Sequence, residues 1–203
     1  EVGADADAYG IDAVGAVNNT GAITARATGG TANASVDTDG SRLRVDVEAD
    51  ADAYGIDGNS DVINTGVIAV TADGGTANVS ADVNDAVFLA YRSAHTDVYG
   101  IDSVGDVTNP GAIPVTATGG TASNDANDAY AWVYVAADAE GIDAGGAVCN
   151  TGAVIVTATG GTASSDVNEA SARCIAWADA YAYGIDARDA VDITGAITVT
   201  ATG

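Results

Sequence analysis

Apolar and polar residues alternate strictly along part of the chain, a pattern typical of a β-strand with one buried face. From residue 43 to residue 55 the odd positions hold Leu, Val, Ala or Gly, and the even positions hold Arg, Asp, Glu or Tyr. The same alternation recurs over residues 172–184, and a second alternating stretch covers residues 148–156. No segment has the 3.6-residue period of an amphipathic helix. We therefore predict an all-β chain.

An internal repeat organises these predicted strands. The tetrapeptide Tyr-Gly-Ile-Asp begins at residues 9, 54, 99 and 183, and Glu-Gly-Ile-Asp begins at residue 140, so the copies are 45, 45, 41 and 43 residues apart. A second block, Val-Asn-Asn-Thr-Gly-Ala-Ile in its first copy, begins at residues 17, 62, 107, 148 and 191. Strand repeats of this kind predict a parallel β-solenoid (β-helix) of about 4.5 tandem repeats of 41–45 residues, with residues 1–203 as a single array. The pattern leaves open whether a repeat makes one wide turn of the chain or two narrower turns.

Equivalent residues of stacked repeats form columns, and two polar columns recur. Asparagine at a bend can satisfy buried backbone groups and its own neighbours. The asparagine column contains Asn19, Asn64, Asn109 and Asn150, with Ile193 in the last copy, and the aspartate column contains Asp12, Asp57, Asp102, Asp143 and Asp186. We interpret both columns as structural ladders.

The predicted outward face changes along the chain. It is charged in the first repeat, where it holds Arg44, Asp46 and Glu48. In later repeats aromatic residues replace these charges, at Tyr91, Tyr130, Trp132, Tyr134, Trp177 and Tyr181. Exposed aromatic patches often mark contact surfaces, so we expect self-association or glycan binding here, and coverage by a loop of the same chain is the alternative. Arg92 falls in the buried column, so either a bulge shifts the register there or the inward assignment fails locally.

Charge and composition exclude several classes of function. The chain has 29 acidic and 6 basic residues, a formal net charge of −23, and no lysine. Phosphate contacts need a basic patch, so we expect no nucleic-acid partner. No apolar run is long enough for a membrane span, and no segment at the start resembles an export signal, which we expect to be already removed or to lie outside this chain. The hydrophobic fraction of 47% is too high for a disordered acidic tail.

Catalysis and cofactors are not expected. The single histidine, His95, lies at an outward position without a nearby nucleophile motif, and we interpret it as a surface histidine. The acidic residues recur in every repeat, which is more typical of a structural ladder than of a catalytic constellation. Calcium is the open alternative, because Asp50 and Asp52 lie on one strand face and offer the oxygen ligands that calcium prefers. We favour a solvated acidic face over weak calcium binding at this pair.

Ice binding is a further, less favoured alternative. Thr198, Thr200 and Thr202 alternate on one face, as in a flat threonine array. Arg26 and Asp73 interrupt the corresponding columns, and threonine is also simply a good residue for an exposed strand.

The combination of Ala-Tyr-Gly-Ile-Asp with Val-x-Asn-Thr-Gly-Ala-Ile-x-Val-Thr-Ala resembles the degenerate repeats of large bacterial surface proteins. These are the autotransporter-like and haemagglutinin-like β-solenoid adhesins. The resemblance covers the whole chain and implies a secreted or cell-surface bacterial protein with a structural or adhesive role. The strand-rich half of the repeat, residues 31–52 in the first copy, departs from that pattern.

The leading hypothesis is a non-enzymatic extracellular structural protein, a β-solenoid fibre or filament segment that self-associates end to end. Neither end of the chain resembles a capping repeat, which suggests a longer array or ends covered by neighbouring subunits. Unpaired backbone groups at an open solenoid end can pair with another strand layer. The alternative hypothesis is an adhesin passenger that binds a glycan or a cell surface through Trp132 and Trp177.

Overall fold

The computed structural model describes residues 1–39, 42–84, 88–126, 129–167 and 173–203. Within these ranges the chain forms β-strands and no helix, and the strand pairs are parallel. The all-β prediction is confirmed. A helix with the length and apolar character to cross a membrane is not found among the described residues.

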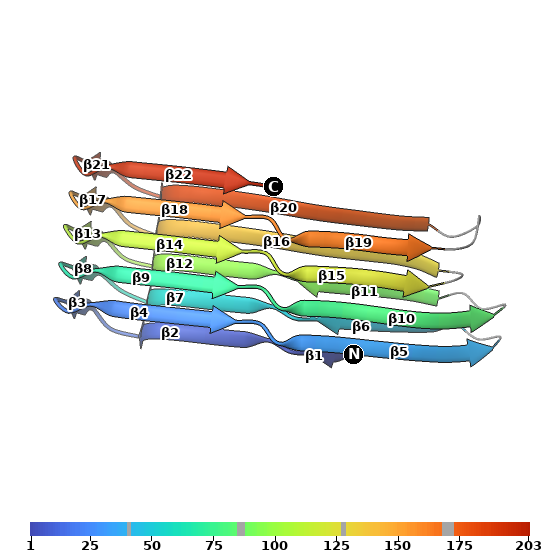
Figure 1. The fold of residues 1–203 in the computed structure, drawn as a ribbon. Helices are drawn as coiled ribbons and strands as arrows, with labels where there is room; N and C mark the ends of the chain where they lie inside the picture. Colours follow the sequence, from blue (N-terminus) through green and yellow to red (C-terminus); the bar gives the residue numbers. More distant parts are fainter. Residues whose placement is uncertain (40–41, 85–87, 127–128, 168–172) are drawn as a thin grey trace.

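The strands form four sheets, and within each sheet the equivalent strands of successive repeats are stacked along one common axis (Figure 1). The largest sheet contains β1 (Val2–Gly3), β2 (Ala6–Ala13), β6 (Leu43–Glu48), β7 (Ala51–Gly58), β11 (Phe88–Ala94), β12 (Thr96–Ser103), β16 (Ala129–Ala144) and β20 (Arg173–Ala187). A narrow sheet contains β3 (Val17–Asn19), β8 (Val62–Asn64), β13 (Val107–Asn109), β17 (Val148–Asn150) and β21 (Val191–Ile193). A third sheet contains β4 (Ile23–Thr28), β9 (Ile68–Asp73), β14 (Ile113–Thr118), β18 (Val154–Thr159) and β22 (Ile197–Thr202). The fourth contains β5 (Thr31–Asp39), β10 (Thr76–Asn84), β15 (Thr121–Ala126) and β19 (Thr162–Val167).

Strand pairing follows the sequence repeat. Tyr54 pairs with Tyr9 on one side and with Tyr99 on the other, so each partner occupies the same place in the neighbouring repeat. One repeat therefore makes one wide turn of the chain, which we call a rung. This arrangement is consistent with a β-solenoid, and Figure 1 shows the rungs stacked from the first, which begins with β1, to the last, which ends with β22; β6 begins the second rung.

The interior is a thin apolar layer between the largest sheet and the two sheets that face it. One cluster of buried residues includes Ile56 and Ile101 of the largest sheet with Ile68 of β9. A second cluster joins Phe88 of β11 to Val79 of β10. Alanine supplies much of the remaining lining, and its small side chain lets the sheets lie close together.

The glycine of the Tyr-Gly-Ile-Asp motif is required by this close approach. A Cβ atom on Gly100 would lie 2.4 Å from the carbonyl oxygen of Gly141 in the next rung and 2.4 Å from Cγ2 of Ile113 in the facing sheet. Both Gly100 and Ile101 are buried, so the in–out alternation is interrupted here and resumes at Asp102.

Three local expectations need correction. The alternating stretch over residues 148–156 is not one strand but two, β17 and β18, because the chain turns between them. In the second rung the strand predicted over residues 43–55 is interrupted between β6 and β7, although its equivalents β16 and β20 are continuous. Arg92 causes neither a bulge nor a failure of the inward assignment. It pairs in register with Val47 and Val133, is 2% exposed, and donates a hydrogen bond to Oδ1 of Asn124 inside the molecule.

The rungs differ in length at one connection. Ala81 pairs with Ala126, and Phe88 pairs with Ala129. The segment from Ala81 to Phe88 is therefore four residues longer than the equivalent segment, from Ala126 to Ala129, in the next rung. Ala126 pairs with Val167, and Tyr130 pairs with Arg173. The segment from Val167 to Arg173 is therefore two residues longer than the segment from Ala126 to Tyr130, and this difference falls at the equivalent place. The connection from the fourth sheet to the largest sheet therefore accommodates the change in repeat length, and the register of the paired strands is unaffected.

Candidate functional site

The asparagine column is continuous through the narrow end of the molecule. Nδ2 of Asn19 donates to Oδ1 of Asn64 at 2.7 Å, and the same contact at 2.7 Å joins Asn64 to Asn109 and Asn109 to Asn150. Each amide nitrogen also donates to the carbonyl oxygen two residues further on, which satisfies the backbone at the turn after the short strand. Asn64, Asn109 and Asn150 are fully buried.

The aromatic residues lie on the outer face of the largest sheet, where two of them stack directly. Tyr91 pairs in register with Trp132, and their rings are parallel within 6° at a centroid distance of 4.7 Å. The guanidinium carbon of Arg44 lies 4.6 Å from the centroid of the Tyr91 ring. Tyr91 remains 37% exposed despite the stacking and the arginine contact, and Trp177 is 46% exposed.

The other predicted aromatic residues are spread over neighbouring columns. Tyr134 pairs in register with Trp177, one column away from Trp132. Tyr181 lies opposite Asp138, and Tyr130 lies in the column on the other side. The six residues thus form a broad outward patch and not one column. Four of them are exposed: Tyr91, Tyr130, Trp177 and Tyr181.

A hollow of about 280 Å³ opens within this patch. Tyr91, Tyr134 and Arg92 line it together with charged groups of the second rung. Those charged groups include Asp46 and Glu48. Arg44, which also lines the hollow, donates from Nε to the Asp46 carboxylate at 3.0 Å. Aromatic faces beside carboxylates and an arginine are a lining that a sugar can use, because it offers both stacking and hydrogen bonding.

The acidic residues form columns in which like charges stand one above another. Asp102 lies between Asp57 and Asp143, and burial, followed by the charges of Asp143 and Asp57, raises the pKa of its carboxyl. In the Tyr-Gly-Ile-Asp column Glu140 replaces a tyrosine, and burial followed by the charge of Asp143 raises its pKa to about 7. These columns are costly to ionise because desolvation and like charges both oppose it.

Tyrosine rings stack in the rungs before Glu140. The ring centroids of Tyr9 and Tyr54 are 4.9 Å apart, and those of Tyr54 and Tyr99 are 5.1 Å apart. Glu140 pairs with Tyr99 on one side and with Tyr183 on the other, so it interrupts the stack.

Asp50 and Asp52, the calcium candidates, both accept hydrogen bonds from the next rung. Oδ1 of Asp50 accepts from the backbone N–H of His95 at 2.7 Å and from the Ser93 hydroxyl at 3.0 Å. Oδ1 of Asp52 accepts from the backbone N–H of Asp97 at 3.3 Å. Burial, followed by the charge of Asp97, raises the pKa of Asp52 to about 6. Their carboxylates therefore join neighbouring rungs.

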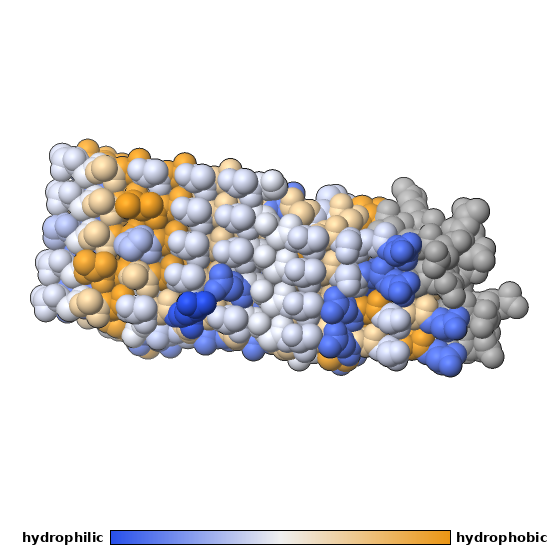
Figure 2. All heavy atoms as spheres, in the orientation of Figure 1, coloured by the Kyte–Doolittle hydropathy of each residue, from blue (hydrophilic) through white to orange (hydrophobic). Residues whose placement is uncertain are grey.

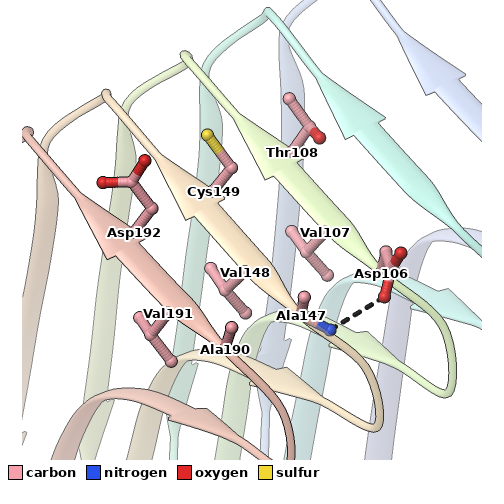
Figure 3. Close-up of a pocket in the computed structure, with 9 residues that line it drawn as sticks. All are labelled: Asp106, Val107, Thr108, Ala147, Val148, Cys149, Ala190, Val191 and Asp192. Carbon is pink, nitrogen blue, oxygen red and sulfur yellow. Dashed lines mark hydrogen bonds between the residues drawn. The ribbon is translucent and has the colours of Figure 1, made fainter.

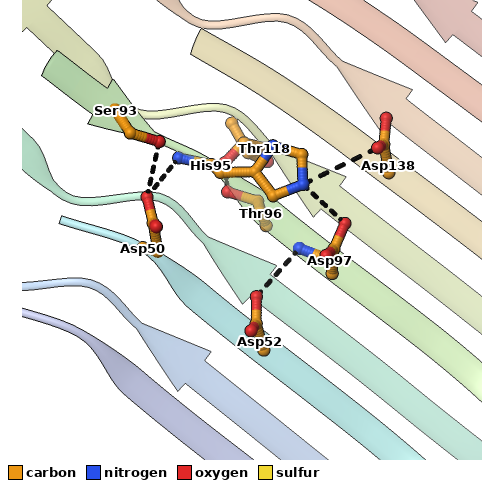
Figure 4. Close-up of polar contacts among 8 residues, drawn as sticks. All are labelled: Asp50, Asp52, Ser93, His95, Thr96, Asp97, Thr118 and Asp138. Carbon is orange, nitrogen blue, oxygen red and sulfur yellow. Dashed lines mark hydrogen bonds and ion pairs between the residues drawn. The ribbon is translucent and has the colours of Figure 1, made fainter. Parts of the chain in front are cut away.

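A group that sequence reasoning missed lies beside them, around His95 (Figure 4). Nε2 of His95 lies 2.8 Å from Oδ1 of Asp97 and 3.7 Å from Oδ2 of Asp138, and the side chain is only 23% exposed. The hydrogen bond to Asp97 is the main cause that raises the pKa of His95. The available signal was the spacing: Asp97 follows His95 by two residues, so both point outward, and Asp138 is the equivalent of Asp97 one repeat later.

A second hollow, of about 290 Å³, lies along the narrow sheet (Figure 3). Val107, Val148 and Val191 form its row of apolar groups, with Cys149 between Thr108 and Asp192. Cys149 is exposed and is not in a disulfide. The Asp106 carboxylate at the edge accepts from the backbone N–H of Ala147 at 2.8 Å, so this polar group already has a partner.

The outer face of the third and fourth sheets holds the threonine columns. Figure 2 shows a surface of mostly intermediate hydropathy, with hydrophobic groups gathered toward the end that carries the short strands. Arg26 and Asp73 form an exposed ion pair of 3.0 Å across the columns that contain Thr71 and Thr118.

Comparison with protein-family models, with curated proteins and with solved structures gave no match for this chain.

Proposed function

We propose that this chain is a non-enzymatic structural segment of an extracellular fibre, built as a parallel β-solenoid of about 4.5 tandem repeats of 41–45 residues. Its setting is a bacterial cell surface or secreted filament, in keeping with the resemblance to β-solenoid adhesin repeats. The in-register pairing of equivalent residues supports this architecture, since each rung repeats the inner surface of the one before it. The −23 charge lies largely on outward columns and keeps such a fibre soluble.

The main observation behind the proposal is that inner residues of a rung are fully buried where another rung lies on each side. Val156 in β18 is 0% exposed because rungs cover it on both sides, whereas its equivalent Val199 in β22 is 44% exposed. Ile193 and Ile197 are exposed in the same way. In the proposed assembly, a rung of a second copy would bury these apolar groups and pair the outer edges of β20 to β22.

Electron microscopy and sedimentation of the purified 203-residue chain test end-to-end stacking. We expect filaments, or oligomers that lengthen as concentration rises. Val199→Lys places a charge on the inner face of the exposed rung and should leave the protein monomeric. Thr200→Lys, the neighbouring outward position on the same strand, is the matched control and should assemble normally. Monomeric particles of the unsubstituted chain at high concentration would contradict self-association.

The hollow beside Tyr91 supports glycan binding as a second candidate. A glycan screen followed by calorimetry tests it, with Tyr134→Ala expected to weaken binding about tenfold through loss of an aromatic face. Trp132→Ala should act in the same direction because Trp132 holds the Tyr91 ring by stacking. Tyr183→Ala, an exposed tyrosine outside the patch, is the control. No binding by the unsubstituted chain, or equal binding by these variants, excludes this function.

A further inference from the structure

One outward column departs from its repeat at two neighbouring rungs. In successive rungs this column contains Asp5, Asp50, His95, Ala136 and Asp179. The strand register gives this order, because Asp97 pairs with Asp138, which places His95 beside Ala136, and Ala136 pairs with Asp179. The single histidine of the chain thus takes the place of an aspartate, and the next rung has a small residue. Because Ala136 has no bulk, the imidazole has room to extend across to the following rung, and Ala136 is fully buried beneath the residues around it.

The imidazole is held in place by contacts on its backbone and on its ring. The backbone N–H of His95 donates to Oδ1 of Asp50 at 2.7 Å. The ring lies 6.0 Å from that of Tyr134, with 18° between their planes. Figure 4 shows the resulting orientation, in which Nε2 points between the Asp97 and Asp138 carboxylates, which lie on adjacent strands.

Three potential ligand atoms therefore converge from two rungs. One ligand atom from each of His95, Asp97 and Asp138 lies within 4.8 Å of the other two. Ligands about 2.0–2.1 Å from a tetrahedral zinc ion are roughly 3.3 Å from one another. The observed separations from Nε2, 2.8 Å to Asp97 and 3.7 Å to Asp138, lie on either side of that value.

Two further atoms of the group, Nδ1 of His95 and Oδ1 of Asp138, are buried and have no hydrogen-bond partner among the residues that the structure describes. An unpartnered buried acceptor on Asp138 is costly, and a cation bound by its carboxylate would offset that cost. The three side chains are 23%, 29% and 32% exposed, so an ion from solvent can reach them. Asp50, Asp52 and Asp179 add negative charge around the group.

We propose that His95, Asp97 and Asp138 form a binding site for one divalent transition-metal ion such as Zn²⁺, which joins two adjacent rungs. Imidazole with two carboxylates suits zinc and its neighbours, whereas calcium takes six to eight oxygen ligands. Because the three side chains are partly exposed, water would complete the coordination of the ion. The site is structural in this proposal, because the ion links β12 to β16 across the sheet.

Isothermal titration with Zn²⁺, together with the absorption spectrum of added Co²⁺, tests the site. We expect one ion per chain, nitrogen and oxygen coordination in the cobalt spectrum, and a higher melting temperature with Zn²⁺ than with EDTA. His95→Ala introduces the residue that the column already has at position 136, so folding should be preserved. We expect this variant and Asp138→Asn to weaken binding about 100-fold and to lose the zinc-dependent shift in melting temperature.

Asp143→Asn is the matched control, since it removes a carboxylate of the same rung outside the group and should leave zinc affinity unchanged. Ca²⁺ in excess should not displace Zn²⁺ from the unsubstituted protein. The proposal is overturned if the unsubstituted chain binds no zinc at a stoichiometry of one. It is equally overturned if His95→Ala, folded by circular dichroism, binds zinc as tightly as the unsubstituted chain.

Discussion

Asn109→Ala tests how much the buried asparagine column stabilises the stack. The Asn109 side chain makes three hydrogen bonds, donating to the Gly111 carbonyl at 2.9 Å and to Asn150 at 2.7 Å, and accepting from Asn64 at 2.7 Å. At about 1 kcal/mol net for each, their loss costs roughly 3 kcal/mol. Oδ1 of the buried Asn150 then loses this donor, which adds about 1 kcal/mol.

The expected loss of unfolding free energy is therefore about 4 kcal/mol. For a chain of this size it corresponds to a fall of roughly 8–16 °C in melting temperature. Urea unfolding followed by far-ultraviolet circular dichroism measures it, because the free energy extrapolates linearly to water and the slope reports any change in the surface exposed.

Asn33→Ala is the matched control on the same kind of stacked strand. Asn33 is exposed and accepts one hydrogen bond, from Asn78 at 3.0 Å, so its replacement should change stability by about 0.5 kcal/mol or less. If the two substitutions cost the same within about 0.5 kcal/mol, the reasoning that the inner column stabilises the stack by satisfying buried groups is wrong.

Two other substitutions test the packing of the largest sheet. Glu140→Tyr should raise the free energy of unfolding at pH 8 by about 1–2 kcal/mol. The new ring completes the stack between Tyr99 and Tyr183. The substitution also removes a partly buried carboxylate, whose charge is partly screened by solvent. Since the folded-state pKa of Glu140 is about 7, above its ordinary 4.5, proton uptake favours the folded state as pH falls through that window, so the unsubstituted chain should gain stability from pH 8 to pH 5. Glu140→Gln should lose this part of the pH dependence without gaining the stack, and equal pH profiles for all three proteins would contradict the assignment. Gly100→Ala should cost about 3 kcal/mol or more in thermal or urea unfolding, since its Cβ would meet the Gly141 carbonyl of the next rung, and a loss below about 1 kcal/mol would show that the rungs can separate there.

Alternation and repetition in the sequence were sufficient to predict the strand class and the inward side of the main strands. Val45, Val47 and Ala49 lie on the inner side as alternation requires, because a period of two is a direct consequence of strand geometry. The number of turns per repeat was not predictable, since both choices bury the same residues of a strand. It became clear only from the pairing of residues such as Tyr54 with Tyr99.

Contacts between different columns could not be predicted from the pattern within one strand. Hydrophobicity alone would not place an arginine such as Arg92 inside the molecule. Its guanidinium group is accommodated there by a hydrogen bond to Asn124, which belongs to a strand of the facing sheet. Likewise, the two-residue spacing of His95 and Asp97 predicts only that these two side chains lie on one face. The group forms only because parallel pairing brings Asp138 of the next rung to its side.

The confinement of length changes to one connection has a consequence for how this protein can vary. Residues can be gained or lost between the end of β10 at Asn84 and Phe88, or at the equivalent places, while the paired strands keep the same partners. The connections that follow β5, β10, β15 and β19 are therefore places where foreign peptides can be inserted for display while the paired strands are kept. Because the strands on either side of these connections are stacked in register, insertions in successive rungs would begin about 4.8 Å apart along the stack.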